Sequence, residues 1–209
     1  MHIIKNQGIC DPHMHIYNGR VYMFATHDRS PGNPIYRMDD WKVFSTDDLV
    51  NWKLEYTLRP EDTFLGKCDE CYATDSAERN GKYYFYFSKG QSCTGVAVAD
   101  KPEGPYRDAL GKALLTKEEI NAPNQVIDPD VFQDPATGKY YLYWGNSFLA
   151  CSELNEDMVS IKEGGTKVLI NRPDKRSYGY NEGTYVFYRN GLYYFMWSEN
   201  DTRSANYRV

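Results

Sequence analysis

Four copies of one pattern run along the chain, each with a glycine turn between a short strand-like segment and a run rich in aromatic residues. The turn glycines are Gly19, Gly81, Gly138 and Gly191, at separations of 62, 57 and 53 residues. Asparagine precedes the glycine in three of the four copies. Asn-Gly between such segments favours a tight hairpin, because a type I′ turn needs positive φ at both central residues. The pattern predicts four β-hairpins.

Further short strands are predicted between the hairpins, at Trp41–Ser45 and Gly95–Val98. A period of this length with several strands per unit is typical of a β-propeller, in which each blade is a four-stranded sheet. No segment of ten or more residues shows helical periodicity. We therefore expect one all-β domain over residues 1–209, a propeller truncated after about three and a half blades, with its C-terminal part beyond Val209.

An acidic residue opens the first strand of each predicted hairpin: Asp11, Asp75, Asp128 and Glu182. The innermost strands of a propeller line its central channel, so these side chains are expected to converge at one mouth. Asp11 and Asp128 each precede a proline, which disfavours the α region and predicts an extended conformation for both. Asp134 also precedes a proline, but it lies in a hairpin turn and is interpreted as structural.

Three further side chains near these acids are candidates for the pocket. His13 follows Asp11 at an alternating position and is expected to contact a sugar hydroxyl. Asp75 is expected to line the pocket and bind substrate, with a hydrogen bond to its own blade as the alternative. Asp130 shares a strand face with Asp128 if the segment is extended, and is a weaker candidate.

Composition and charge exclude two classes of partner. Aromatic residues make up 15% of the chain, with 19 tyrosines, which suits a β-rich core. The net charge of -5 comes without a basic stripe, so no nucleic-acid partner is expected. A mean hydropathy of -0.69 and apolar runs of about five residues leave no membrane-spanning helix, which needs roughly 20 residues.

The five cysteines bear on metal binding, and together with the N-terminal residues they bear on the cellular location of the protein. Cys68 and Cys71 form the only C-x-x-C among the five cysteines, and without a second ligand pair we predict that they bind no metal. The first ten residues contain no long apolar segment typical of a secretory signal. The odd number of cysteines suits a reducing compartment, so a cytoplasmic location is expected, with a secreted protein lacking its leader as the alternative.

Five segments together resemble glycoside hydrolase family 43, the five-bladed propeller enzymes that cleave arabinose- and xylose-containing glycans. They are Asp11–Pro12 with the following NGRVYMF hairpin, Phe44–Trp52, Ala73–Ser88, Ile127–Gly145 and Asn181–Ser198. The order and spacing of these segments carry the resemblance, which covers nearly the whole chain. It implies an oligosaccharide or plant polysaccharide as substrate.

The resemblance also implies roles for the acids. Asp11 matches the general base, Glu182 the general acid, and Asp128 the residue that orients the acid and raises its pKa. Tyr72 stands where the family commonly has tryptophan in a Trp-Ala-Pro-Asp segment, so a tyrosine is expected as the sugar platform. The family's final blade supplies an arginine to the sugar and a histidine near a central metal ion. We expect no cofactor for catalysis, and a central structural metal ion in the complete propeller.

The implied reaction is hydrolysis by an inverting general acid–base mechanism. Such enzymes hold the two carboxyls roughly 6.5–9.5 Å apart, which leaves room for a water. An exo-acting α-L-arabinofuranosidase or β-xylosidase is the leading interpretation. A non-catalytic propeller that binds carbohydrate or protein is the alternative, and it predicts the loss of at least one of the three acids. All three are present.

Overall fold

The computed structural model describes residues 4–5, 7–29, 36–118, 121–171 and 179–209. Strands dominate these ranges, and their one helical element is the 3₁₀ turn Pro60–Asp62. None of the described segments forms an apolar helix long enough to cross a membrane. The predicted all-β architecture is confirmed.

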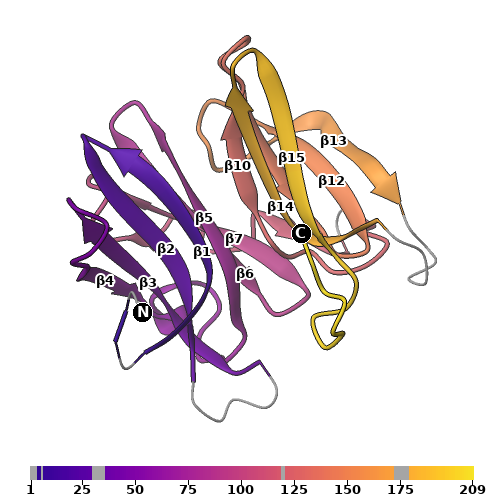
Figure 1. The fold of residues 1–209 in the computed structure, drawn as a ribbon. Coiled ribbons are helices and arrows are strands. Elements are labelled where there is room, and N and C mark those ends of the chain that lie inside the picture. Colours follow the sequence, from indigo (N-terminus) through magenta and orange to yellow (C-terminus); the bar gives the residue numbers. More distant parts are fainter. Residues whose placement is uncertain (1–3, 6, 30–35, 119–120, 172–178) are drawn as a thin grey trace.

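The strands form four antiparallel sheets that follow one another along the chain (Figure 1). The first contains β1 (Gly8–Tyr17), β2 (Arg20–Asp28), β3 (Met38–Thr46) and β4 (Lys53–Leu58). The second contains β5 (Cys71–Arg79), β6 (Lys82–Lys89), β7 (Cys93–Ala99), β8 (Arg107–Asp108) and β9 (Leu115–Thr116), and both β8 and β9 pair with β7. The third contains β10 (Asp130–Gln133), β11 (Tyr140–Trp144), β12 (Phe148–Leu154) and β13 (Ile161–Asn171). The fourth contains β14 (Tyr180–Arg189) and β15 (Leu192–Glu199).

The first strands of neighbouring sheets contact one another, β1 with β5, β5 with β10 and β10 with β14. Each sheet then proceeds outward in sequence order. This is the blade arrangement of a propeller, and it confirms that the first strand of each hairpin is the innermost one. The fourth sheet has two described strands, so the structure contains three blades and the inner half of a fourth.

All four predicted hairpins are present. At Asn18-Gly19, Asn80-Gly81 and Asn190-Gly191 both central residues have positive φ, between 52° and 82°. The third hairpin differs, because β10 and β11 are joined by a longer turn in which the Gly138 N–H donates to the Asp134 carbonyl at 2.7 Å. The Asp134 side chain also accepts a hydrogen bond from Thr137, which is the structural role expected of it.

Aromatic side chains fill the spaces between the blades. Trp41 of the first sheet is fully buried against Phe87 of the second, with ring centroids 4.7 Å apart. Trp144 of the third sheet is equally buried and belongs to a cluster that includes Tyr86 of the second. The high aromatic content therefore serves mainly to pack neighbouring blades together, and large aromatic rings suit this role because each buries much apolar area.

Carboxylates also join successive blades. Val131 at the start of the third blade donates its N–H to Asp75 Oδ2 of the second at 2.6 Å. Val186 of the fourth blade donates in the same way to Asp130 Oδ2 of the third at 3.0 Å. These two equivalent bonds satisfy backbone groups that are buried at the centre of the molecule, where an unpaired N–H would be costly.

Candidate active site

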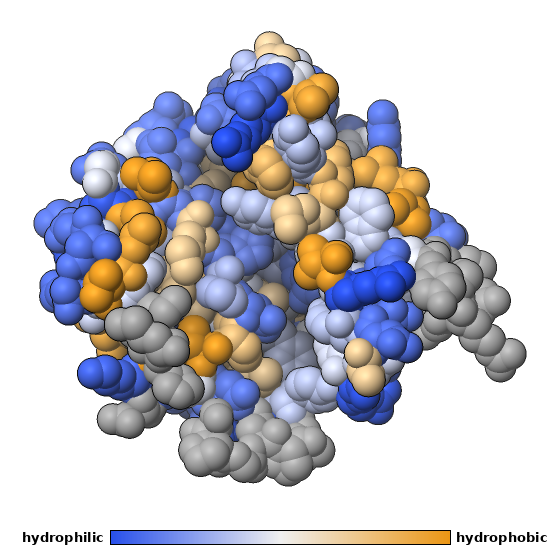
Figure 2. All heavy atoms as spheres, viewed as in Figure 1, coloured by the Kyte–Doolittle hydropathy of each residue, from blue (hydrophilic) through white to orange (hydrophobic). Residues whose placement is uncertain are grey.

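A cavity of about 840 Å³ opens where the inner strands of the blades begin. Seen in space-filling form, the molecule is hollowed near the middle of this view, between the first two sheets and the β14–β15 pair (Figure 2). The cavity is lined by five of the six residues expected to form the site: Asp11, His13, Tyr72, Asp128 and Glu182. Residues some 170 positions apart in the sequence therefore share one pocket.

Asp11 and Asp128 have an unusual backbone conformation. Asp11 lies in a bulge of β1, between the paired residues Cys10 and His13, and has a φ of 49°. Asp128 lies two residues before β10 and has a φ of 57°. The expected extended conformation is therefore wrong for both. Positive φ is uncommon for residues other than glycine, is better tolerated by Asp and Asn, and tends to occur at functional sites.

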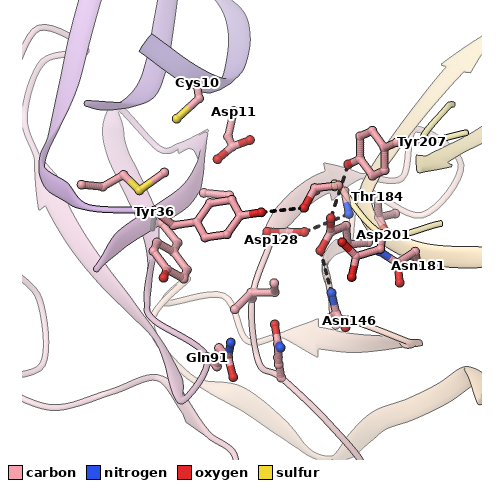
Figure 3. Close-up of a pocket in the computed structure, with 18 of the residues that line it drawn as sticks. Cys10, Asp11, Tyr36, Gln91, Asp128, Asn146, Asn181, Thr184, Asp201 and Tyr207 are labelled. Atoms are coloured by element: carbon pink, nitrogen blue, oxygen red, sulfur yellow. Dashed lines mark hydrogen bonds between the residues drawn. The ribbon is translucent and has the colours of Figure 1, made fainter. Parts of the chain in front are cut away.

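Glu182 lies in an irregular stretch at the start of β14, where the register with β15 shifts on both sides of it. Asn146 Nδ2 donates to Glu182 Oε2 at 2.6 Å, and the Tyr207 hydroxyl donates to Oε1 at 3.4 Å (Figure 3). Ser198 holds the backbone by donating to the Glu182 carbonyl at 2.9 Å. Both carboxyl oxygens thus have a protein donor, and the side chain faces the cavity.

Asp128 is tied directly to the segment that carries Glu182. The Gly183 N–H donates to Asp128 Oδ2 at 2.9 Å. Burial raises the pKa of Asp128 well above its usual range, and the neighbouring charges of Glu182 and Asp11 raise it further. Two carboxyls in such a position disfavour ionisation of both, so the Asp128–Glu182 pair retains a proton to higher pH than either isolated acid.

The pKa of Glu182 is also raised. Burial is the largest cause, and the charge of Asp11 acts in the same direction, whereas the hydrogen bond from Asn146 opposes the shift. A carboxylic acid that remains protonated towards neutral pH can act as a general acid. The environment of Glu182 is therefore suited to the role that its sequence position predicts.

Asp11 comes from the opposite side of the cavity, on the β1 bulge (Figure 3). Burial raises the pKa of its carboxyl, the charge of His13 lowers it, and Asp28 raises it again. The net effect is a raised pKa, and His13 is the one of these influences that favours the ionised form that a general base requires. The carboxyl separation of roughly 6.5–9.5 Å expected for inversion stays a prediction.

The structure places Asp75 away from the sugar pocket. Its side chain is fully buried, and Oδ1 lies 2.6 Å from His15 Nε2 and 3.0 Å from His13 Nδ1, while Oδ2 accepts from Val131. This corrects the expectation of substrate contact, because both oxygens are engaged with neighbouring blades. Asp130 is likewise buried and bound to Val186, so it is an interblade residue and not a catalytic candidate.

His13 lies between the pocket and this buried network. Burial alone would lower the pKa of His13, but Asp75, Asp130 and Asp11 outweigh it and raise the pKa to about 9. His13 is therefore a cation at neutral pH. It lines the cavity, and its expected contact with a sugar hydroxyl stays a prediction.

Among the described residues, His13, His15 and Asp75 form the one group of three potential metal ligands that come close together. His15 and Asp75 are joined by a direct hydrogen bond of 2.6 Å, and Asp75 uses its other oxygen on Val131. His13 Nδ1, by contrast, is buried and has no hydrogen-bond partner among the described residues, so the donor set of this group is compatible with a metal ion.

Several residues that line the cavity were not predicted as site residues, because they lie outside the repeated hairpins. They are Asn146, which follows β11, and Asp201, Arg203 and Tyr207, which follow β15. Asn146 contacts Glu182 only because the turn between β11 and β12 meets the start of β14, and its own position in the sequence shows no motif. Tyr72 lines the cavity as expected, and its role as a sugar platform stays a prediction.

Comparisons with known proteins agree with this geometry. A β-D-galactofuranosidase of Aspergillus niger is 31% identical, over 95% of this chain and 58% of that protein. A xylosidase/arabinosidase of Bacteroides ovatus is 27% identical, over 99% of this chain and 75% of that protein. The structure of an α-L-arabinofuranosidase from Clostridium thermocellum superimposes with a TM-score of 0.71 at 29% identity, over 93% of this chain and 65% of that one. This chain thus spans roughly three fifths to three quarters of these relatives.

The family profile of glycosyl hydrolases family 43 matches residues 3–209, almost the whole chain. The matched region contains the four repeated hairpins and the three acids that share the cavity. On the fold, the site and this match together, the chain belongs to glycosyl hydrolases family 43.

Proposed function

We propose that this protein is an inverting, exo-acting glycosidase that releases arabinose or xylose from oligosaccharides or plant polysaccharides. The observation that carries the proposal is the convergence of Asp11, Asp128 and Glu182 on one cavity from three different blades. A non-catalytic propeller would have no need for three carboxyls in one pocket, since unpaired acids there are costly.

In the proposed mechanism Glu182 donates its proton to the leaving glycosidic oxygen, and Asp11 removes a proton from the attacking water. Bond formation and cleavage at the anomeric carbon then occur in one displacement, with no covalent intermediate. Asp128 acts through Glu182. It is held by the Gly183 N–H, and because two neighbouring carboxyls disfavour ionisation of both, the pair with Glu182 retains a proton.

The names of the relatives support the substrate class. They include a xylosidase/arabinosidase, whose name refers to two pentoses, xylose and arabinose. They also include a β-D-galactofuranosidase, whose name refers to a sugar with a five-membered ring. Hydrolysis by paired carboxyls needs no cofactor. The central metal ion expected for a complete propeller stays a prediction, and His13, His15 and Asp75 are the described residues that would hold it.

A panel of 4-nitrophenyl α-L-arabinofuranoside, β-D-xylopyranoside and β-D-galactofuranoside tests the proposal. We expect turnover of a pentoside, and NMR of the first-formed sugar should show inverted anomeric configuration. Retention would refute the inverting mechanism. Binding of xylo- or arabino-oligosaccharides without turnover, unchanged in Glu182→Ala, would favour the non-catalytic alternative.

A further inference from the structure

The C-x-x-C segment, residues 68–71, runs into the start of β5 beside one wall of the candidate active site. Cys71 is the first residue of β5, and the next residue, Tyr72, lines the active-site cavity. Cys68 lines a second cavity of about 460 Å³ on the outside of the same segment. The proposed glycosidase chemistry uses neither thiol.

The two thiols form a contacting pair with unequal exposure. Their side chains are hydrogen-bonded to each other. Cys71 is fully buried, whereas Cys68 is partly exposed at the second cavity. An exposed sulfur in contact with a buried one is the arrangement in which an external disulfide can reach the first and the second can complete the exchange.

Hydrogen bonds to neighbouring strands fix the backbone of this segment. The Met38 N–H donates to the Asp69 carbonyl at 3.0 Å, and the Gly90 N–H donates to the Glu70 carbonyl at 2.8 Å. The Thr26 hydroxyl donates to the Cys71 carbonyl at 2.6 Å. The backbone that carries the two thiols is therefore held in place by neighbouring strands.

The surroundings of the two thiols shift their pKa values in opposite directions. The hydrogen bond from Cys71 is the largest cause that lowers the pKa of Cys68, and the Glu70 backbone and Lys89 add to it against the effect of burial, giving a value of about 7. The same hydrogen bond and burial raise the pKa of Cys71 far above its usual range. Cys68 is thus the thiolate near neutral pH, and Cys71 the protonated donor.

We propose that Cys68 and Cys71 form a reversible thiol–disulfide exchange site, with Cys68 as the attacking sulfur and Cys71 as the resolving one. The Cys68 thiolate attacks one sulfur of a small disulfide, which forms a mixed disulfide and releases one thiolate. Cys71 then attacks Cys68 Sγ, and its proton passes to the second departing thiolate, which leaves as a thiol. The two cysteines are oxidised by two electrons, and the external disulfide is reduced to two thiols.

The cavity beside Cys68 indicates the kind of disulfide that fits. Its wall carries Arg29, Arg59 and Lys67 together with four carboxylates, Asp39, Asp40, Glu61 and Asp69. Charges of both signs around one opening suit a molecule that carries both carboxylates and ammonium groups. A low-molecular-mass peptide disulfide has this chemistry, and oxidised glutathione is a suitable probe.

Peptide mapping after incubation with oxidised glutathione tests the site. The wild-type chain should form a disulfide between Cys68 and Cys71, whereas Cys71→Ala should stop at the mixed disulfide on Cys68. Iodoacetamide should alkylate Cys68 in the reduced protein with a midpoint near pH 7. Cys71→Ala should move that midpoint upward, because the principal donor is lost, and Cys71→Ser should restore part of the difference through its hydroxyl.

Cys93→Ala is the matched control, because Cys93 is also a buried cysteine and lies in β7 of the same sheet. It should leave both the disulfide and the alkylation midpoint unchanged. A stable mixed disulfide in the wild-type chain, without closure by Cys71, would overturn the proposal. An alkylation midpoint at the ordinary thiol value of about 8.5, or one unchanged in Cys71→Ala, would overturn the assignment of roles.

Discussion

Replacing Asn146 with alanine tests whether one hydrogen bond sets the protonation of the candidate acid. Asn146 Nδ2 lies 2.6 Å from Glu182 Oε2, and the Ser147 hydroxyl donates to Asn146 Oδ1 at 3.0 Å, which orients the amide so that its nitrogen faces Glu182. This bond opposes the rise in the pKa of Glu182. Without it, we expect the pKa to rise further.

The size of the effect follows from the difference between charged and neutral hydrogen bonds. A bond to a charged group contributes about 1.5–3 kcal/mol and a neutral one about 0.5–1.5 kcal/mol. Loss of the Asn146 amide therefore disfavours the carboxylate form by about 1–1.5 kcal/mol relative to the protonated form. Since tenfold in an equilibrium is about 1.4 kcal/mol, the basic limb of the pH–rate profile should move to higher pH by about one pH unit.

The assay is kcat/KM against pH on a pentoside with a poor leaving group, which depends on the general acid, with the carboxyl of Glu182 followed by ¹³C NMR in the same variant. A general acid must be protonated, so activity falls as the pH rises through its pKa, and a higher pKa preserves activity to higher pH. Tyr207→Phe is the control, because its 3.4 Å contact is longer and should matter less. A basic limb that stays in place or moves to lower pH, in a folded Asn146→Ala protein, would refute the reasoning.

Three further predictions concern the catalytic roles and the stability of the blades. Glu182→Ala should impair substrates with poor leaving groups more than activated aryl glycosides, whereas Asp11→Ala should impair both alike; equal losses on both substrates in Glu182→Ala would contradict the acid assignment. Because the pKa of His13 is raised to about 9, its stabilising charge is fully present below about pH 6.5 and lost as the pH rises through 9, so the free energy of unfolding in urea should fall across that interval. Asp75→Asn should lower stability by about 3–5 kcal/mol and flatten that fall, and a slope equal to that of the wild type would exclude the pair as its cause. Gly95→Ala should destabilise the protein by about 1–3 kcal/mol in thermal unfolding, because the new Cβ would lie 2.5 Å from the ring of Phe87 on the neighbouring strand. An unchanged melting temperature would show that the ring can move aside.

The sequence by itself determined the blades and the candidate acids. Hairpin formation depends on residues adjacent in the chain, so Asn-Gly turns between aromatic strands predict their position without knowledge of the fold. The repeat then places one acid near the start of each inner strand, and Asp11, Asp128 and Glu182 do line one cavity. Local pattern was sufficient here because a propeller repeats the same local geometry around one axis.

Only the tertiary structure decided how those side chains are used. Asp75 precedes its hairpin in the sequence much as the other acids do, yet its structural counterpart is the buried Asp130. Both accept a backbone N–H from the next blade, and Asp75 also contacts His15 of the first blade. The contact of Asn146 with Glu182 likewise arises where two blades adjoin, and the positive φ of Asp11 lies in a bulge that the strand pattern did not predict. Burial, hydrogen-bond partners and pKa depend on groups that are distant in sequence and close in space, and no pattern along one strand specifies them.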